Sequence, residues 1–174
     1  VTRNLTPKQK ALTINLDPNI YGTFAEIGAG QETVRHFFRA GGASHTIAKA
    51  MSAYDKDFSD AIYGKEPKNR YVTQNRLRKM LRYEVSLVEE RIPREVNPYR
   101  KFFSYANTVT TINFNKTVQG HGWVGIRFQS EAGQEYNEAV IHVKFKENDA
   151  TLQQETLGKL GVNLIYGAFY YNDN

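Results

Sequence analysis

The chain has 174 residues, of which 24% are charged and 40% apolar, and its formal net charge is +5. The absence of cysteine excludes disulfides, zinc–thiolate centres and thiol catalysis, and no apolar run approaches the ~18 residues of a membrane span. The N-terminal residues also lack the apolar centre of a signal peptide, so we expect a soluble cytoplasmic protein with a real core and no membrane partner.

The first third of the chain predicts a strand–helix–strand unit. Residues 1–16 contain Thr6-Pro7, a pair typical of a helix start. Residues 20–27 are expected to form a strand and residues 31–40 a helix with one apolar face. Residues 45–54 are expected to form a second, largely buried strand, followed by helical turns over residues 55–63. A parallel crossover joins such strands most simply.

The rest of the chain predicts a helix, three strands and a last helix. The longest helix is expected over residues 73–92, where apolar residues recur at spacings of three and four before Pro93. Strands are expected over residues 102–114, 123–128 and 139–145, and the short polar connections favour antiparallel hairpins. Thr151 is expected to cap the final helix, in which Gly158 and Gly161 permit close packing.

Together these elements predict a mixed α/β fold. We expect a single domain over residues 1–174 with a weak boundary near residues 65–70. Because the chain stops directly after an apolar helix, we also expect it to be either the N-terminal part of a longer protein or one isolated domain.

A glycine turn between the first strand and its helix is the main candidate site. In Gly28-Ala29-Gly30, two glycines match a dinucleotide-binding pattern, but Thr33 stands where the third glycine belongs. A strand-to-helix turn that needs positive φ angles explains the same glycines. If the turn is functional, the backbone N–H groups from Gly30 to Thr33 are expected to hold a phosphate. The candidate ligand-binding residues are Glu26, Gly28, Gly30, Gln31, Thr33, Arg35, Lys49 and Asp55.

A basic cluster follows between residues 65 and 82, where seven basic residues accompany one acid, Glu66. Basic residues at the start of a helix oppose its dipole, so the cluster suggests an anionic partner, although a solvated helix face explains it as well. The candidate contacts to an anion or to nucleic acid are Arg76, Arg78, Lys79 and Arg82.

A second polar patch is predicted on the later strands, and its members are His121, Trp123, Arg127, His142 and Lys144. Residues at alternate positions of neighbouring strands share one face of a sheet, and a half-exposed sheet would account for such a face without any function. The element order from Thr73 is also that of some nucleases, but the acidic residues that such metal chemistry requires are absent from residues 123–128.

Several chemistries lack their motifs. The sequence has no G-x-x-x-x-G-K-[ST] phosphate loop, no G-x-S-x-G nucleophile elbow and no His-x-x-x-His metal pair. We therefore predict no metal site and assign no catalytic residue and no cofactor.

The segments YGTFAEIGAGQ, FFRAGGASHTIAKAMSAYD, GHGWVGIRFQ and LGKLGVNLIYGAFYY resemble the N-terminal portion of a little-characterised bacterial family, found in Bacteroidetes among others. Members of that family are often labelled nicotinate-nucleotide adenylyltransferase or TonB-dependent receptor. The residues here do not support either label, because the His-x-Gly-His signature of an adenylyltransferase is absent. The resemblance implies a longer protein and transfers no catalytic residues.

The leading functional hypothesis is the binding of a phosphorylated ligand, with a nucleotide favoured, at the Gly28–Gly30 turn, as part of an enzyme or of a binding protein. The alternative is a non-enzymatic module that binds nucleic acid or assembles into a homo-oligomer through its aromatic surface.

Overall fold

A computed structural model describes residues 4–171 and shows a mixed α/β fold, as predicted from the sequence. The elements in chain order are α1 (Pro7–Leu16), β1 (Ile20–Gly28), α2 (Glu32–Ala40), η1 (Ala43–His45), β2 (Ile47–Met51), α3 (Lys56–Tyr63), η2 (Pro67–Asn69), α4 (Gln74–Arg91), η3 (Arg94–Val96), β3 (Lys101–Thr110), β4 (His121–Gln129), β5 (Tyr136–Lys144) and α5 (Ala150–Tyr170).

All five strands form one sheet in the order β2-β1-β3-β4-β5. The strand β1 lies between β2 and β3 and is parallel to both. The β3–β4 and β4–β5 pairs are antiparallel, so the parallel unit and the two hairpins predicted from the sequence are confirmed. The parallel and antiparallel parts share a common sheet.

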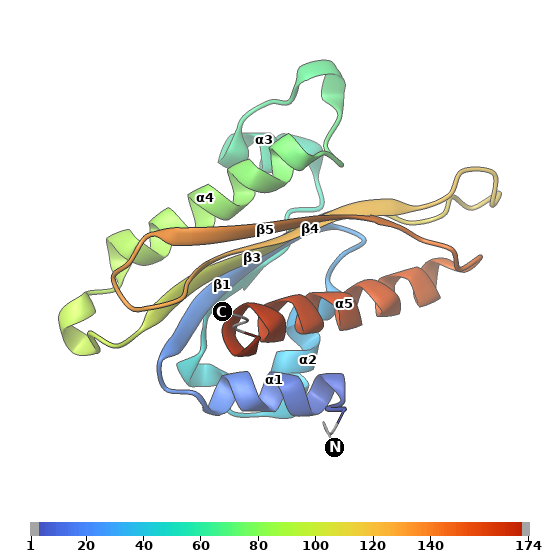
Figure 1. The fold of residues 1–174 in the computed structure, drawn as a ribbon. Coiled ribbons are helices and arrows are strands. Elements are labelled where there is room, and N and C mark those ends of the chain that lie inside the picture. Colours follow the sequence, from blue (N-terminus) through green and yellow to red (C-terminus); the bar gives the residue numbers. More distant parts are fainter. Residues whose placement is uncertain (1–3, 172–174) are drawn as a thin grey trace.

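Helices cover both faces of this sheet. Figure 1 shows α1, α2 and α5 on one face and α3 and α4 on the other. Alternate residues of β1 point to opposite faces, so Phe24 packs in the core under α2 and α5, whereas Ala25 packs in the core under α4. No helix within residues 4–171 is both long and apolar enough to cross a membrane.

Most helix starts follow from local sequence signals. Thr6 forms a capping box with Gln9 at the start of α1, and Thr73 accepts a hydrogen bond from the Arg76 N–H at the start of α4. The prediction for the last helix is wrong by two residues. Its cap is Asp149, whose carboxylate accepts from the Leu152 N–H.

Two strand predictions also need correction. The second strand spans only Ile47–Met51, and Ala48, Lys49 and Ala50 are exposed because β2 is the outer strand of the sheet. A run of small and apolar residues does not by itself distinguish an edge strand from a central one. The third strand ends at Thr110, so Phe114 lies beyond it and is fully exposed.

The helices α2 and α5 approach each other closely through glycine. A Cβ at Gly158 would lie 2.8 Å from the Cβ of Glu32, and one at Gly161 would collide with the side-chain oxygens of Thr33 and Tyr105. The two positions therefore provide the close packing that the sequence predicted for this helix.

Candidate ligand-binding site

The predicted glycine turn joins the carboxyl end of β1 to α2. Gly28 has a φ of +74°, which a residue with a side chain rarely adopts. The Gln31 amide donates to the Gly28 carbonyl and to the Ser52 hydroxyl, and the Ala29 N–H donates to the Val109 carbonyl at 3.2 Å. The turn is thus held to β3 and to the residue that follows β2.

The first turn of α2 is occupied by the protein's own carboxylate. Glu26 accepts from the backbone N–H groups of Thr33 and Val34, each at 3.1 Å, and from the Asn107 amide at 2.9 Å. A helix N-terminus favours an acceptor for its free N–H groups, and here the Glu26 carboxyl is that acceptor. The Thr33 N–H, one of the groups expected to hold a phosphate, is therefore already engaged.

Burial dominates the electrostatics of Glu26, which is 2% exposed. Desolvation raises the pKa of its carboxyl to about 7, against hydrogen bonds from Val34, Asn107 and Thr33 that lower it. Asn107 also donates to the Gly30 carbonyl at 3.0 Å, and the Thr33 and Tyr105 hydroxyls lie 2.9 Å apart. Tyr105 and Asn107 were missed from the sequence, although polar groups at alternate positions of a buried strand are a signal for such a network.

The turn lies where ligands often bind in open α/β sheets. The chain leaves β1 through α2 on one face and leaves β2 through α3 and α4 on the other (Figure 1). This reversal occurs at the carboxyl end of β1, which is the usual crevice for a ligand. In this structure the protein's own side chains engage the backbone of the turn: Gln31 donates to the Gly28 carbonyl, Asn107 donates to the Gly30 carbonyl, and Glu26 accepts from the Thr33 N–H.

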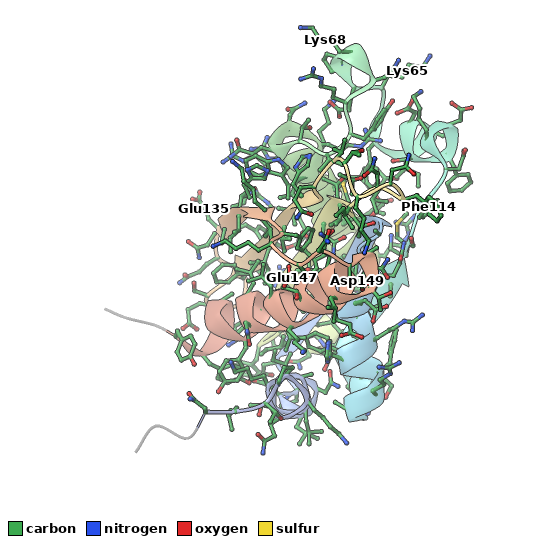
Figure 2. The ribbon with its side chains drawn as sticks, turned by 90° about the vertical axis from the view of Figure 1, so that its right-hand side faces the viewer. Lys65, Lys68, Phe114, Glu135, Glu147 and Asp149 are labelled. Atoms are coloured by element: carbon green, nitrogen blue, oxygen red, sulfur yellow. The ribbon has the colours of Figure 1, made fainter. Side chains whose placement is uncertain are left out.

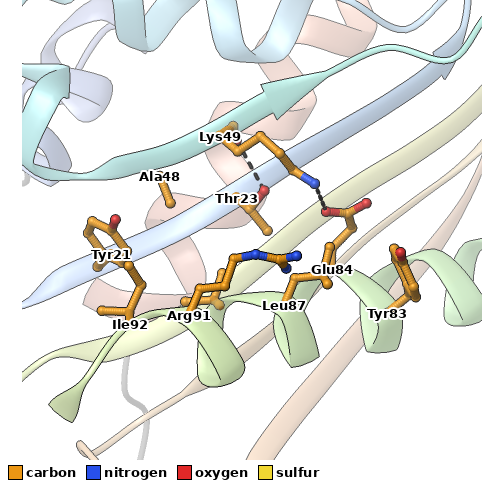
Figure 3. Close-up of a pocket in the computed structure, with 10 residues that line it drawn as sticks. Tyr21, Thr23, Ala48, Lys49, Tyr83, Glu84, Leu87, Arg91 and Ile92 are labelled. Atoms are coloured by element: carbon orange, nitrogen blue, oxygen red, sulfur yellow. Dashed lines mark hydrogen bonds and ion pairs between the residues drawn. The ribbon is translucent and has the colours of Figure 1, made fainter. Parts of the chain in front are cut away.

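A cavity lies away from the glycine turn, between β1, β2 and the second half of α4. Its volume is about 450 Å³, within the range typical of small-molecule sites. Figure 3 shows its lining, with Tyr21 and Tyr83 at opposite ends. The lining residues are Tyr21, Thr23, Ala48, Lys49, Tyr83, Glu84, Leu87, Val88, Arg91 and Ile92.

A hydrogen-bonded chain of charged groups forms one wall of this cavity. The Lys49 ammonium lies 2.6 Å from one oxygen of Glu84, and the Tyr63 hydroxyl donates to the other at 2.6 Å. The Glu84 side chain is fully buried, whereas that of Lys49 is 42% exposed. Burial and then the negative charge of Glu84 raise the pKa of Tyr63 well above its usual range, so Tyr63 stays a donor.

Arg91 provides the other positive charge in the cavity. Its side chain extends along the opening between Ile92 and Glu84 in Figure 3. Within residues 4–171, no carboxylate lies at ion-pairing distance from its guanidinium. With Lys49 neutralised by Glu84, the cavity has one uncompensated positive charge beside aromatic and aliphatic side chains.

Sequence reasoning included Lys49 but missed Glu84 and Arg91. Glu84 follows Met80 by four residues and precedes Val88 by four, so it lies on the apolar stripe of α4. A carboxylate on such a stripe was the available signal. Arg91 stands at the end of α4 and had no comparable signal in the sequence.

The other predicted ligand-binding residues are dispersed. Arg35 is exposed on α2, with its Nε 3.9 Å from Glu32. Asp55 caps α3 by accepting from the Phe58 N–H at 2.9 Å. The structure thus gathers Glu26, Gly28, Gly30, Gln31 and Thr33 at the turn, and it places Lys49 in the cavity on the α4 side of the sheet.

Three members of the basic cluster, Arg76, Arg78 and Lys79, are paired with carboxylates. Arg76 has no exposed surface, and its guanidinium bonds to Glu66 at 3.2 Å and to the Ser59 hydroxyl at 2.7 Å. It is four residues before Met80 and hence on the buried stripe of α4. An external anion therefore has no access to Arg76 in this structure.

The remaining members of this cluster lie nearer the surface. Lys79 pairs with Glu66 at 2.9 Å and Arg78 with Glu138 at 3.0 Å, whereas Arg82 is exposed. Lys65 and Lys68 lie at the tip of the connection between α3 and α4 (Figure 2). The positive charge that faces solvent is thus smaller than the sequence suggests.

The second polar patch is brought together on the α4 side of β4 and β5. Trp123 stacks on His142 with 4.4 Å between ring centroids, and the His121 and His142 ring nitrogens lie 3.2 Å apart. Lys144 pairs with His121 across the strands, and Arg127 bonds to Glu138 at 3.1 Å. Burial, with the nearby charges of His142 and Lys144, lowers the pKa of His121. No group of three metal-binding side chains occurs among the described residues.

Comparisons with known proteins identify the fold. Protein-family models and curated protein sequences give no match to this chain. A competence-damaged protein (CinA) superfamily protein from Enterobacter cloacae has a similar structure, with a TM-score of 0.67 and 12% identity over 95% of this chain and 94% of that one. The competence/damage inducible protein CihA from Agrobacterium tumefaciens has a TM-score of 0.62 and 14% identity over 95% of this chain and 99% of that one.

These likenesses correct the resemblance noted in the sequence. The structural neighbours are competence-damaged or competence/damage-inducible proteins. The resemblance to a family labelled nicotinate-nucleotide adenylyltransferase or TonB-dependent receptor is therefore wrong. The four segments lie on β1 and its turn, on the stretch that includes β2, on β4 and on α5. At 9–14% identity, the structural neighbours establish that this chain has the fold of CinA superfamily proteins.

Proposed function

We propose that the protein binds a small phosphorylated ligand, with a nucleotide as the first candidate, in the cavity between β1, β2 and α4. The observation that carries this proposal is the solvent-exposed Arg91, which has no carboxylate partner among residues 4–171 and lines a cavity of about 450 Å³ with a tyrosine at each end. A guanidinium presents a fork of donors that matches phosphate, and the neighbouring tyrosines offer flat apolar surface to a ring.

The charge of the cavity favours a ligand with one anionic group. Lys49 and Glu84 cancel each other at 2.6 Å, which leaves Arg91 to attract the anion. Tyr21, Tyr83, Leu87 and Ile92 supply the apolar lining. A free inorganic anion would leave this surface unused, so an organic phosphate is the better fit.

The cavity is a better location than the glycine turn for physical reasons. A phosphate at the turn would have to displace the Glu26 carboxylate from the Thr33 and Val34 N–H groups. The cavity requires no such displacement. The carboxyl end of β1 remains the second location to test, because the connections reverse there.

The test is a thermal-shift screen of nucleoside mono- and diphosphates against the intact protein. A ligand at 100 times its dissociation constant adds about 2.7 kcal/mol, which corresponds to about 5–10 °C in a domain of this size. Arg91→Ala should remove the shift. Arg82→Ala, an exposed arginine on the same helix that does not line the cavity, is the matched control and should keep it.

Three other outcomes are informative. A shift that survives in Arg91→Ala but disappears in Gln31→Ala would move the ligand to the glycine turn. A thermal shift that both Arg91→Ala and Gln31→Ala retain would place the ligand at neither location. The absence of any shift in the wild type would reject nucleotides as the ligand.

A further inference from the structure

The two outer strands of the sheet differ in how they are protected. The strand β2 has only five residues with Lys49 at its centre, and its pairing with β1 contains a register shift. Short length, a central lysine and an irregularity are the features by which proteins block pairing at a sheet edge. The β2 edge is therefore protected against pairing with a strand of another chain.

The opposite edge has none of these features. The strand β5 has nine residues, pairs with β4 in unbroken register from Tyr136 to Lys144, and contains no proline. Its central residues Ala139, Val140 and Ile141 carry no charge, and Ile141 is 37% exposed. In residues 4–171, no further strand pairs with its outer side, as Figure 1 shows.

The charges around β5 are arranged so that the strand complements itself. Its first end and the preceding turn are acidic, through Glu131, Glu135 and Glu138. Its far end carries Lys144 and, just beyond the strand, Lys146, before the acidic Glu147 and Asp149. Two copies placed antiparallel bring the acidic end of each strand beside Lys144 of the other, and the uncharged centres face each other.

We propose that β5 is a homodimer interface at which two copies pair antiparallel and form one continuous sheet. A two-fold axis perpendicular to the sheet at Ile141 places Ile141 of each copy opposite the other. The same register places Glu138, which also pairs with Arg78 and Arg127 of its own chain, opposite Lys144 of the second copy. The α4 sides of both copies then lie on the same side of the joined sheet.

The outward N–H and C=O groups of β5 gain partners in this arrangement. The exposed Ile141 side chains meet on the α5 side, where Ala139 of one copy also faces Val143 of the other. A peptide of another sequence would make the same backbone bonds but would lack the matching of charges and apolar residues. The second copy is therefore the occupant that the strand favours.

The experiment measures the mass of the intact protein by light scattering over a concentration series. The mass should rise from 19.9 kDa toward twice that value. Ile141→Lys introduces an edge lysine and should return the mass to 19.9 kDa, with circular dichroism confirming that the variant is folded. Ala50→Lys adds the same residue to the β2 edge and should leave the dimer intact.

Hydrogen exchange of the wild type provides a measurement that does not depend on a variant. The amides of residues 137–143 that face outward should exchange more slowly as concentration rises, and those of β2 should not change. A monomer at every concentration would overturn the proposal. A dimer that Ile141→Lys leaves unchanged, or in which β5 gains no protection, would do the same.

Discussion

The buried carboxyl of Glu26 should make the stability of this protein fall as pH rises. Its pKa is about 7 in the folded protein against 4.5 for an unperturbed glutamate, because burial disfavours the charged form. The folded state consequently holds a proton between these pH values that the unfolded state has lost. The stabilisation is complete below pH 4.5 and is lost as pH rises through 7.

The size of the effect follows from the same two values. One unit of pKa difference corresponds to about 1.4 kcal/mol, so the total loss is roughly 3 kcal/mol. About 2 kcal/mol of this loss falls between pH 5.5 and 8, where the measurement is practical. Glu26→Gln is neutral like the protonated acid and still accepts from Thr33 and Asn107 through one oxygen. Its NH2 group faces the Val34 N–H, so that hydrogen bond is lost at every pH and only the change of stability with pH is compared.

The assay is urea unfolding of the wild type and of Glu26→Gln at several pH values in this range. The wild type should lose about 2 kcal/mol of stability relative to the variant between pH 5.5 and 8, because the amide does not titrate and changes the stability equally at every pH. Histidine titration affects both proteins and cancels in the difference. If the free energies of unfolding of the two proteins change in parallel with pH, the reasoning is refuted. If the variant does not fold, an NMR titration of the Glu26 carboxyl in the wild type measures its pKa directly.

Two further predictions concern packing and buried charge. Gly161→Ala should destabilise the protein by roughly 1–3 kcal/mol in thermal unfolding, because its Cβ would collide with Thr33 and Tyr105. Gly167→Ala, in the same helix with its nearest neighbour atom at 3.4 Å, should be neutral or stabilising by up to about 1 kcal/mol, and equal effects would contradict the packing described. Arg76→Ala should cost more than about 2 kcal/mol in urea unfolding, because it vacates buried space and removes the buried one of the two cations, Arg76 and Lys79, that pair with the Glu66 carboxylate. The exposed Arg82→Ala should change stability by no more than about 0.5 kcal/mol, and a similarly small effect of Arg76→Ala would refute the buried role.

Local signals in the sequence were sufficient for most of the secondary structure. Apolar residues at spacings of three and four located α4, and threonine caps located the starts of α1 and α4. Turn lengths separated the hairpins from the parallel unit, as the strand pairing confirms. These features depend on interactions between residues near each other in the chain, so a single sequence carries them.

The position of a strand in the sheet was not determined in this way. The segment around β2 resembles a buried strand in composition, yet it lies at the edge because β1 pairs on its other side with β3. The charges of α4 show the same limit. Arg76 and Glu84 belong to a stripe that the sequence shows, but only the arrangement of β2 and α3 decides which partners they meet.

The sequence by itself determined the mixed α/β class, the extent of most elements and the glycine turn after β1. Only the tertiary structure decided what fills that turn and where a cavity opens. Glu26 and Asn107 are 81 residues apart in the chain, and Lys49 and Glu84 are 35 apart. Their contacts depend on the order of the strands and on which face each helix covers. Strand order and helix placement depend on the apolar surface buried over the whole core, which no short segment of the sequence determines.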